Sequence, residues 1–202
     1  MIHDITLTIS EELAVWPGDA PFRRVWQSRM EDGACVNLST LQCSLHIGTH
    51  VDAPLHFERH GVGVDRMDLS HFVGPATVLD VSGAEEIRIA ALERHAFHPR
   101  LLLRTGAWQD RTAFPTALPS IHPEVPGYLG ERGVVLLGVD LPSVDPLDSP
   151  DLANHRALHA AGIAILESAY LDDVAPGDYH LVALPLRIAG ADGSPVRAIL
   201  TR

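Results

Sequence analysis

Lysine is absent from this 202-residue chain, and all 15 of its basic side chains are arginine. The absence excludes chemistry that needs a lysine amine, including the phosphate-binding P-loop, Schiff-base formation and a serine–lysine nucleophile pair. Positive charge is scarce as a whole, because 26 acidic residues give a net charge of −11 with histidine neutral. A chain this acidic repels nucleic-acid phosphates and anionic lipid surfaces, so we expect neither nucleic acid nor membrane as a partner.

Cysteine and long apolar runs are also scarce. The two cysteines, Cys35 and Cys43, lie eight positions apart in an apolar-alternating stretch, which fits neither a redox CxxC pair nor a zinc knuckle. We predict that both are buried free thiols. No apolar stretch approaches the roughly 20 residues that cross a bilayer, and residues 1–13 lack the basic start and apolar run of a signal peptide. The expected location is the cytoplasm.

Short apolar stretches separated by glycine and proline predict many strands and few helices. Strands are expected over residues 2–9, 22–30, 35–45, 76–81, 101–105, 134–140, 163–166, 180–188 and 196–201, the last two as a hairpin turning at 192–194. Helices are expected over 86–95 and 151–161, and a loop over 115–126. Without repeats or linkers, this pattern predicts a single α/β domain over residues 1–202, with a mixed β-sheet and flanking helices.

Histidine, in contrast, is abundant, with 12 residues in the chain. Three of them lie with a carboxylate in the segment HIGTHVDAPLHF, which supplies His46, His50, Asp52 and His56. Neutral imidazole and carboxylate are the ligand types preferred by Zn²⁺ and its first-row neighbours. The segment therefore predicts a metal site.

The same segment contains too much glycine and proline for a helix, so His46 and His50 must converge through a turn. Pro54 favours an extended Ala53, which should carry His56 away from the other three side chains. His56 is therefore better placed as an acid or base than as a fourth ligand. The alternative is three unrelated histidines on a solvated loop.

A second group of candidate ligands follows later in the chain. His155 and His159 share one face of the predicted helix, so either could be a ligand, although such pairs are also common on surfaces. Glu167 ends an apolar strand, where an unpaired carboxylate is costly. If both groups converge, three histidines and two carboxylates suit two metal ions about 3.5 to 4 Å apart, bridged by a carboxylate and water.

Taken together, these residues resemble a known family. HIGTHVDAPLHF is similar to the HxGTHxDxPxHF signature of the cyclase-type metal-dependent hydrolases. Similarity to their kynurenine formamidase (arylformamidase) branch extends through VWPGD at 15–19, GVDLPSVD at 138–145, IAILE at 163–167 and ALPLR at 183–187. The resemblance implies a swivelling β/β/α (cyclase-like) fold. It also implies a metal-dependent amidohydrolase in which a metal-activated water hydrolyses N-formyl-L-kynurenine to L-kynurenine and formate, in tryptophan degradation via the kynurenine pathway.

The resemblance further implies two zinc ions per subunit. One Zn²⁺ would be held by His46, His50 and Asp52. The other would be held by His155, Glu167 and the same Asp52, with Glu167 touching both ions. No GxSxG nucleophile elbow occurs in the chain, which agrees with water as the nucleophile.

The remaining implied roles concern the substrate and the assembly. By resemblance, His56 would donate and accept protons, Trp16 would contact the aromatic ring of the substrate, and the protein would be a homodimer. On the residues alone, Trp16 could instead anchor the core. The family pattern selects His155 over His159 as a ligand, and the roles of Asp140, Asp145 and His159 stay open. Alternative functions are a related cyclic or aryl amide hydrolase, such as an isatin hydrolase, and a non-catalytic metal- or ligand-binding module.

Overall fold

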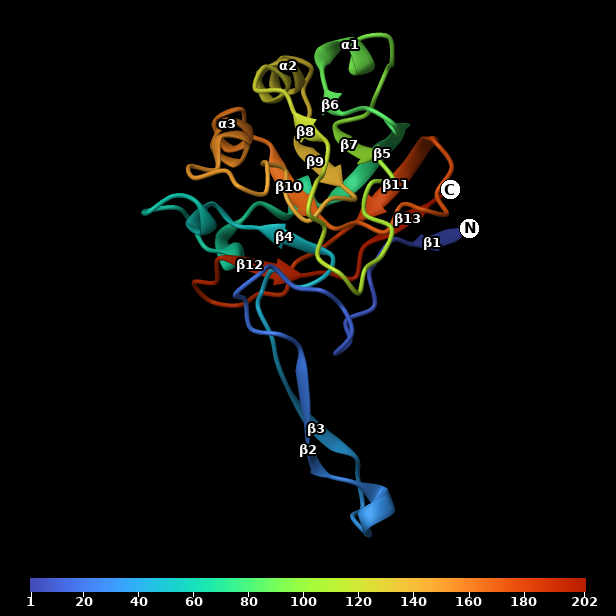
Figure 1. Cartoon of the computed structure of the whole chain (residues 1–202), viewed down its shortest axis with the longest axis vertical. Helices are drawn as coiled ribbons and strands as arrows, with labels where there is room; N and C mark the ends of the chain where they lie inside the picture. The colour runs from blue at the N-terminus through green and yellow to red at the C-terminus, as the bar shows by residue number, and fades with distance from the viewer.

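A nine-stranded mixed sheet forms the centre of the computed structural model, which describes residues 1–202 (Figure 1). Its strands are β1 (Ile2–Asp4), β4 (His50–Asp52), β5 (Val73–Asp80), β7 (Arg100–Arg104), β9 (Leu136–Val139), β10 (Ala164–Glu167), β11 (Gly177–Val182), β12 (Gly193–Pro195) and β13 (Ile199–Thr201). Their spatial order is β1-β13-β11-β5-β7-β9-β10-β4-β12. The strands β5, β7, β9 and β10 are parallel, and the strands on either side pair antiparallel. The predicted mixed sheet is confirmed.

Three short helices, α1 (Ile89–Leu92), α2 (Val125–Glu131) and α3 (Ala153–Ala160), lie together along one side of the sheet (Figure 1). Each contributes buried apolar side chains to one cluster with β7, β9 and β10. No helix is both long enough and apolar enough to span a membrane. The flanking helices expected from the sequence are therefore present, although α1 is only one turn.

Two apolar cores lie on opposite faces of the sheet. Leu101, Leu102 and Leu103 of β7 are all fully buried, because successive side chains of a strand point to opposite faces. Leu101 and Leu103 pack under the helices, whereas Leu102 belongs to the second core. That core also contains Val51 of β4 and Leu200 of β13, strands near the two ends of the sheet order. The sheet therefore curls around the second core.

A long hairpin projects from this body, and we call residues 21–45 the arm (Figure 1). It consists of β2 (Arg23–Ser28) and β3 (Leu38–Gln42), joined through a 3-10 turn at Met30–Asp32. The two strands pair only with each other, in a separate two-stranded sheet with a bulge between Trp26 and Ser28. The arm therefore has little support from the rest of the chain.

The arm also explains why the prediction of buried thiols is wrong. Cys35 is exposed and Cys43 is only partly buried. Apolar alternation in this stretch correctly indicated strands, but alternation predicts burial only where another layer covers one face. Phe22, Cys43 and Leu45 at the base of the arm pack against the body, but no layer of the same chain covers the rest of it.

The helix predicted over 86–95 is also wrong in its first half. Residues Glu86–Ile87 form β6, which pairs parallel with β8 (Ser120–Ile121), and only α1 follows. Ile87 is fully buried in the core under the helices. A non-local strand pairing thus determines the structure of a segment whose apolar spacing alone is typical of a helix.

The strands predicted over 2–9 and 180–188 end earlier, at Asp4 and Val182, and a predicted loop and a predicted turn also differ. The loop expected over 115–126 contains β8 and the start of α2, which accepts Pro126 because a proline in the first helical turn loses no hydrogen bond. The turn expected at 192–194 is largely strand β12, which pairs with β4. β11 and β13 do pair antiparallel, as predicted. The chain between them, however, is not a simple turn, because it contributes β12, which pairs with β4.

Candidate metal centre

Strand register places three of the predicted ligands on one face of the sheet. His50 and Asp52 are two positions apart in β4, so their side chains point to the same face. Glu167, the last residue of β10, lies directly opposite His50 in the antiparallel pair. Helix α3 covers this face and brings His155 to it. Residues more than a hundred positions apart therefore meet.

The four side chains are buried and close together. His50 Nε2 lies 3.4 Å from Glu167 Oε2 and 3.5 Å from Asp52 Oδ1. His155 Nε2 lies 3.4 Å from both Asp52 Oδ2 and Glu167 Oε1. Each imidazole thus faces both carboxylates. Ligand atoms of His50, Asp52 and Glu167 all lie within 4.8 Å of one another, a spacing that a single ion could bridge.

The charges of this cluster favour a bound cation. Burial raises the pKa of the Asp52 carboxyl, but the surrounding histidines lower it well below its usual value. Burial lowers the pKa of His50, yet its contacts with Asp52 and Glu167 outweigh this and raise it to about 10. The same balance, with Asp145 added, raises the pKa of His155 to about 12. The two buried carboxylates therefore attract positive charge to the space between them.

One atom of the cluster has no hydrogen-bond partner. Asp52 Oδ2 is buried and accepts no hydrogen bond, although His155 Nε2 lies 3.4 Å away, and a buried polar atom without a hydrogen bond is costly. The nitrogen and oxygen donors around it are those that zinc and its first-row neighbours bind. The residues present therefore fit a divalent metal.

His46 and His56 extend the cluster toward solvent. His46 Nδ1 lies 2.9 Å from Asp52 Oδ1, and its Nε2 lies 3.1 Å from Asp192 Oδ2. The His56 ring lies 4.1 Å from the His46 ring, centroid to centroid. Ligand atoms of His46, Asp52 and His56 form a second group within 4.8 Å. Asp52 is the residue common to both groups.

The extended conformation predicted for Ala53 is confirmed, but the prediction that it carries His56 away from the other side chains is wrong. Ala53 is extended, with φ −92° and ψ 151°. The chain then turns back in a 3-10 helix over Pro54–His56, so His56 returns to the other histidines rather than leaving them. Its side chain remains 32% exposed and lines a cavity. Proline restricts the residue before it but does not fix the direction that the chain takes after it.

Two acceptors that the sequence did not reveal orient the histidines. His50 Nδ1 donates to the Gly48 carbonyl oxygen at 2.8 Å, which leaves Nε2 facing the carboxylates. Asp145 lies 2.6 Å from His155 Nδ1 and also accepts from the backbone amide of His155. Such outer partners fix the tautomer and direction of ligating imidazoles. The only signal for Asp145 was its place in GVDLPSVD.

Asp140 and His159 take no part in the cluster. Asp140 accepts hydrogen bonds from the Thr105 hydroxyl and from the Thr105 and Gly106 amides, so it fixes the chain after β7. His159 lies on the outer side of Phe57, with ring centroids 5.8 Å apart. Of the two histidines left open in the predicted helix, only His155 reaches the carboxylates.

A cavity of about 410 Å³ opens beside the cluster, which is within the usual size range for small-molecule sites. Its lining includes residues of the metal-ligand cluster and its surroundings, namely His46, His50, His56, His155 and Glu167. Its other walls include the aromatic side chains of Trp16, Trp108 and Phe114. Trp16 packs edge-on against Phe114 at 5.1 Å and is 37% exposed, so it is not a core anchor.

Comparison with known proteins agrees with this arrangement. Residues 3–146 match a family model described as putative cyclase. The chain is 48% identical to a kynurenine formamidase of Geobacillus thermodenitrificans, over 98% of this chain and 96% of that protein. A solved potential metal-dependent hydrolase with cyclase activity has a TM-score of 0.86 and 25% identity, over 99% of this chain and 96% of that one. Isatin hydrolase A from Labrenzia aggregata has a TM-score of 0.86 and 26% identity, over 99% of this chain and 93% of that one. The chain therefore belongs to the cyclase family, as its HIGTHVDAPLHF segment predicted.

Proposed function

We propose that this chain is a metal-dependent amidohydrolase that hydrolyses N-formyl-L-kynurenine to L-kynurenine and formate, a step of tryptophan degradation via the kynurenine pathway. The main support is a buried cluster in which two histidines lie against two carboxylates. The cluster adjoins a cavity that is lined by aromatic side chains. Relatives named kynurenine formamidase, similar over nearly the whole chain, support the choice of substrate. A non-catalytic binding module has no comparable support.

We propose that the cluster holds two Zn²⁺ ions. One would be held by His46, His50 and Asp52, and the other by Asp52, His155 and Glu167, with Glu167 reaching both. When bound, such ions polarise an amide carbonyl and acidify water. The central position of Asp52, shared by both groups of ligand atoms, supports this division.

The remaining cavity residues orient the substrate and move a proton. Trp16 and Phe114 provide an aromatic wall against which the ring of an aryl formamide can pack. His56 lines the same cavity, and its ring lies 5.9 Å from that of His155 in the buried cluster. An aniline nitrogen leaves poorly as an anion, and His56 is placed to supply the proton that it needs.

Substrate and metal can be tested together. We expect the purified chain to hydrolyse N-formyl-L-kynurenine with a kcat/KM at least about 100-fold above that for isatin, since misplacing the scissile bond costs a factor of that order. Chelation should abolish turnover and lower the melting temperature, because ligand binding to the native state stabilises it. Elemental analysis should count two zinc ions per chain. Preferential hydrolysis of isatin, or full activity in metal-free protein, would contradict the proposal.

We also propose that the protein is a homodimer in which the arm docks on the second copy. An isolated two-stranded hairpin is marginally stable in water. This one exposes a set of large apolar side chains, Val25, Trp26, Met30, Val36, Leu38 and Leu41. Such a surface is typical of a protein interface.

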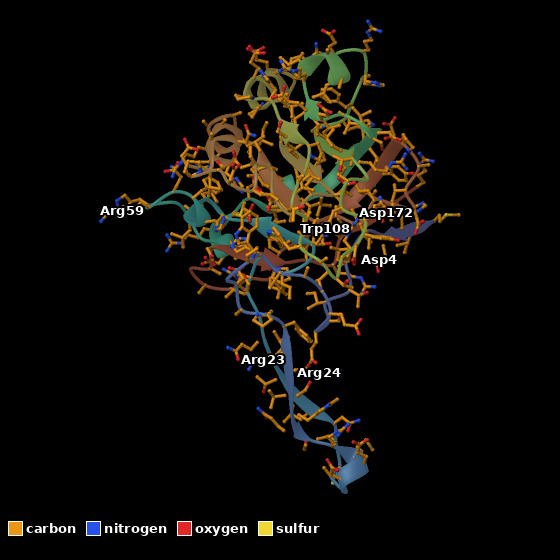
Figure 2. The ribbon with its side chains drawn as sticks, viewed as in Figure 1. Asp4, Arg23, Arg24, Arg59, Trp108 and Asp172 are labelled. Carbon is orange, nitrogen blue, oxygen red and sulfur yellow. The ribbon has the colours of Figure 1, made fainter.

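Charge supports a second copy of the same chain as the partner. The arm carries three arginines against two acids, whereas the chain as a whole has a net charge of −11. Figure 2 shows Arg23 and Arg24 near the place where the arm leaves the body. A basic arm and an acidic body are complementary between copies, and complementary potentials favour association.

A single charge on the arm tests this assembly. Leu41 is 67% exposed, and we expect L41D to convert a dimer into a monomer in light scattering, because the aspartate would be buried without a partner. V25D tests the opposite face of the hairpin. The control is L69D, on an exposed leucine outside the arm. A monomeric wild-type protein, or arm variants that both stay dimeric, would show that the arm is not the interface.

We infer that the protein works in a reducing compartment, the cytoplasm. Cys35 and Cys43 are free thiols, and Cys35 is exposed. Exposed free thiols persist where glutathione and thioredoxin keep them reduced. The thiols thus support the cytoplasmic location predicted from the sequence.

A further inference from the structure

We propose that Asp19 binds the α-ammonium group at the amino-acid end of the substrate. This proposal rests on the proposed function, because it concerns the same cavity and deepens the choice of substrate. It makes Asp19 a specificity-determining residue that favours amino-acid substrates over simpler aryl formamides.

Asp19 and Trp16 are held in one tight turn. The Asp19 amide donates to the Trp16 carbonyl oxygen at 2.9 Å. Gly18 between them has a φ of +99°, which glycine adopts without strain. Both residues line the cavity beside the cluster. The turn thus fixes the backbone of Asp19 relative to that of Trp16, whose indole we propose contacts the substrate ring.

The Asp19 carboxylate has no partner within the chain. It makes no side-chain hydrogen bond and no ion pair, although the residue is partly buried. The cavity has one other carboxylate outside the proposed ligands, that of Asp192, and it already faces His46 at 3.1 Å. Asp19 is therefore the free negative charge of the cavity.

The other charges of the cavity point to the same kind of ligand. No arginine lines it, and the chain has no lysine. A substrate group with a negative charge would find no cationic side chain there except histidine. The aromatic faces of Trp16 and Phe114 also attract cations. Away from the cluster that we propose holds the metal ions, the lining therefore favours a cationic group, and in N-formyl-L-kynurenine the only such group is the α-ammonium.

The test compares D19N with wild type on two substrates. One is N-formyl-L-kynurenine, and the other is 2-formamidoacetophenone, which has the same ring, ketone and formamide but no amino-acid end. We expect D19N to lower kcat/KM for the first substrate by about 10- to 100-fold, mainly through KM, because a hydrogen bond between charged groups is lost. For the second substrate, kcat/KM should change less than about twofold, because nothing there contacts Asp19.

Matched variants separate recognition from structure. Asparagine suits the same turn, so D19N should preserve the position of Trp16. E11Q removes an equal charge from an exposed site outside the cavity and should leave both substrates unaffected. D19E should restore part of the preference for N-formyl-L-kynurenine over 2-formamidoacetophenone that D19N loses. An equal loss on both substrates would overturn the proposal, because Asp19 would then act through the turn.

Binding of the product provides a readout that does not depend on turnover. L-Kynurenine has the same α-ammonium, and calorimetry should show weaker binding to D19N than to wild type by a similar factor. Unchanged L-kynurenine affinity would overturn the role of Asp19. If wild type binds L-kynurenine through Asp19 but does not hydrolyse N-formyl-L-kynurenine, the proposed function fails while the ammonium site stands.

Discussion

Replacement of Glu167 by glutamine is expected to remove bound metal and to lower turnover at least about a thousandfold. A metal ion stabilises a transition state by several kcal/mol, which corresponds to about three powers of ten in rate. Glu167 is buried at the end of β10 and faces both His50 and His155 at 3.4 Å. Its Oε1 also accepts from the Val144 amide at 2.8 Å. Glutamine has the same shape and can still accept that bond, so the substitution removes charge with little change in packing.

Asp140 provides the matched control. It is also a buried carboxylate, and it follows the neighbouring parallel strand β9. Its hydrogen bonds go to Thr105 and Gly106 and not to the histidines. D140N should therefore lower the melting temperature but retain metal, as measured by elemental analysis. If E167Q retained two metal ions and full turnover, the proposed ligand set would be wrong.

The sequence was informative about the site because the site is built from short segments with a regular period. HVD at 50–52 places two ligand types two positions apart, and a strand directs both to one face. The apolar run that ends at Glu167 indicated a buried strand with a carboxylate at its end. Each half of the cluster could thus be predicted from local pattern.

The sequence alone could not predict how the halves are joined. Pairing of β4 with β10 fixes Glu167 opposite His50, and this pairing joins segments more than a hundred positions apart. Without it, neither the choice of His155 over His159 nor the role of Asp145 follows from spacing. The family resemblance supplied the first of these, and only the structure supplied the second.

The arm marks a different limit of sequence reasoning. Its apolar alternation correctly predicted strands, but it also led to the wrong prediction for Cys35 and Cys43. Alternation shows that one face of a strand is suited to burial. It does not show whether the covering layer belongs to the same chain or, as we propose here, to another copy.

Replacement of His56 by glutamine is expected to preserve the two metal ions that we propose and to lower kcat by about 100- to 10,000-fold, the usual contribution of a positioned acid or base. The His56 side chain lines the cavity and is 32% exposed, whereas the proposed ligands His50 and His155 are buried. The control is H60Q, on an exposed histidine of the same surface loop. Its kcat and metal content should match those of wild type.

The leaving group distinguishes proton transfer by His56 from a structural role. If His56 protonates the departing nitrogen, electron-withdrawing substituents on the substrate ring should reduce the difference in kcat between wild type and H56Q. The reason is that a more weakly basic nitrogen leaves more easily without a proton. A gap of constant size across such a series would contradict that role. Loss of one metal ion from H56Q would instead make His56 a ligand, which its place in the second group with His46 and Asp52 permits geometrically. Metal content and the substituent series therefore assign His56 to one role or the other.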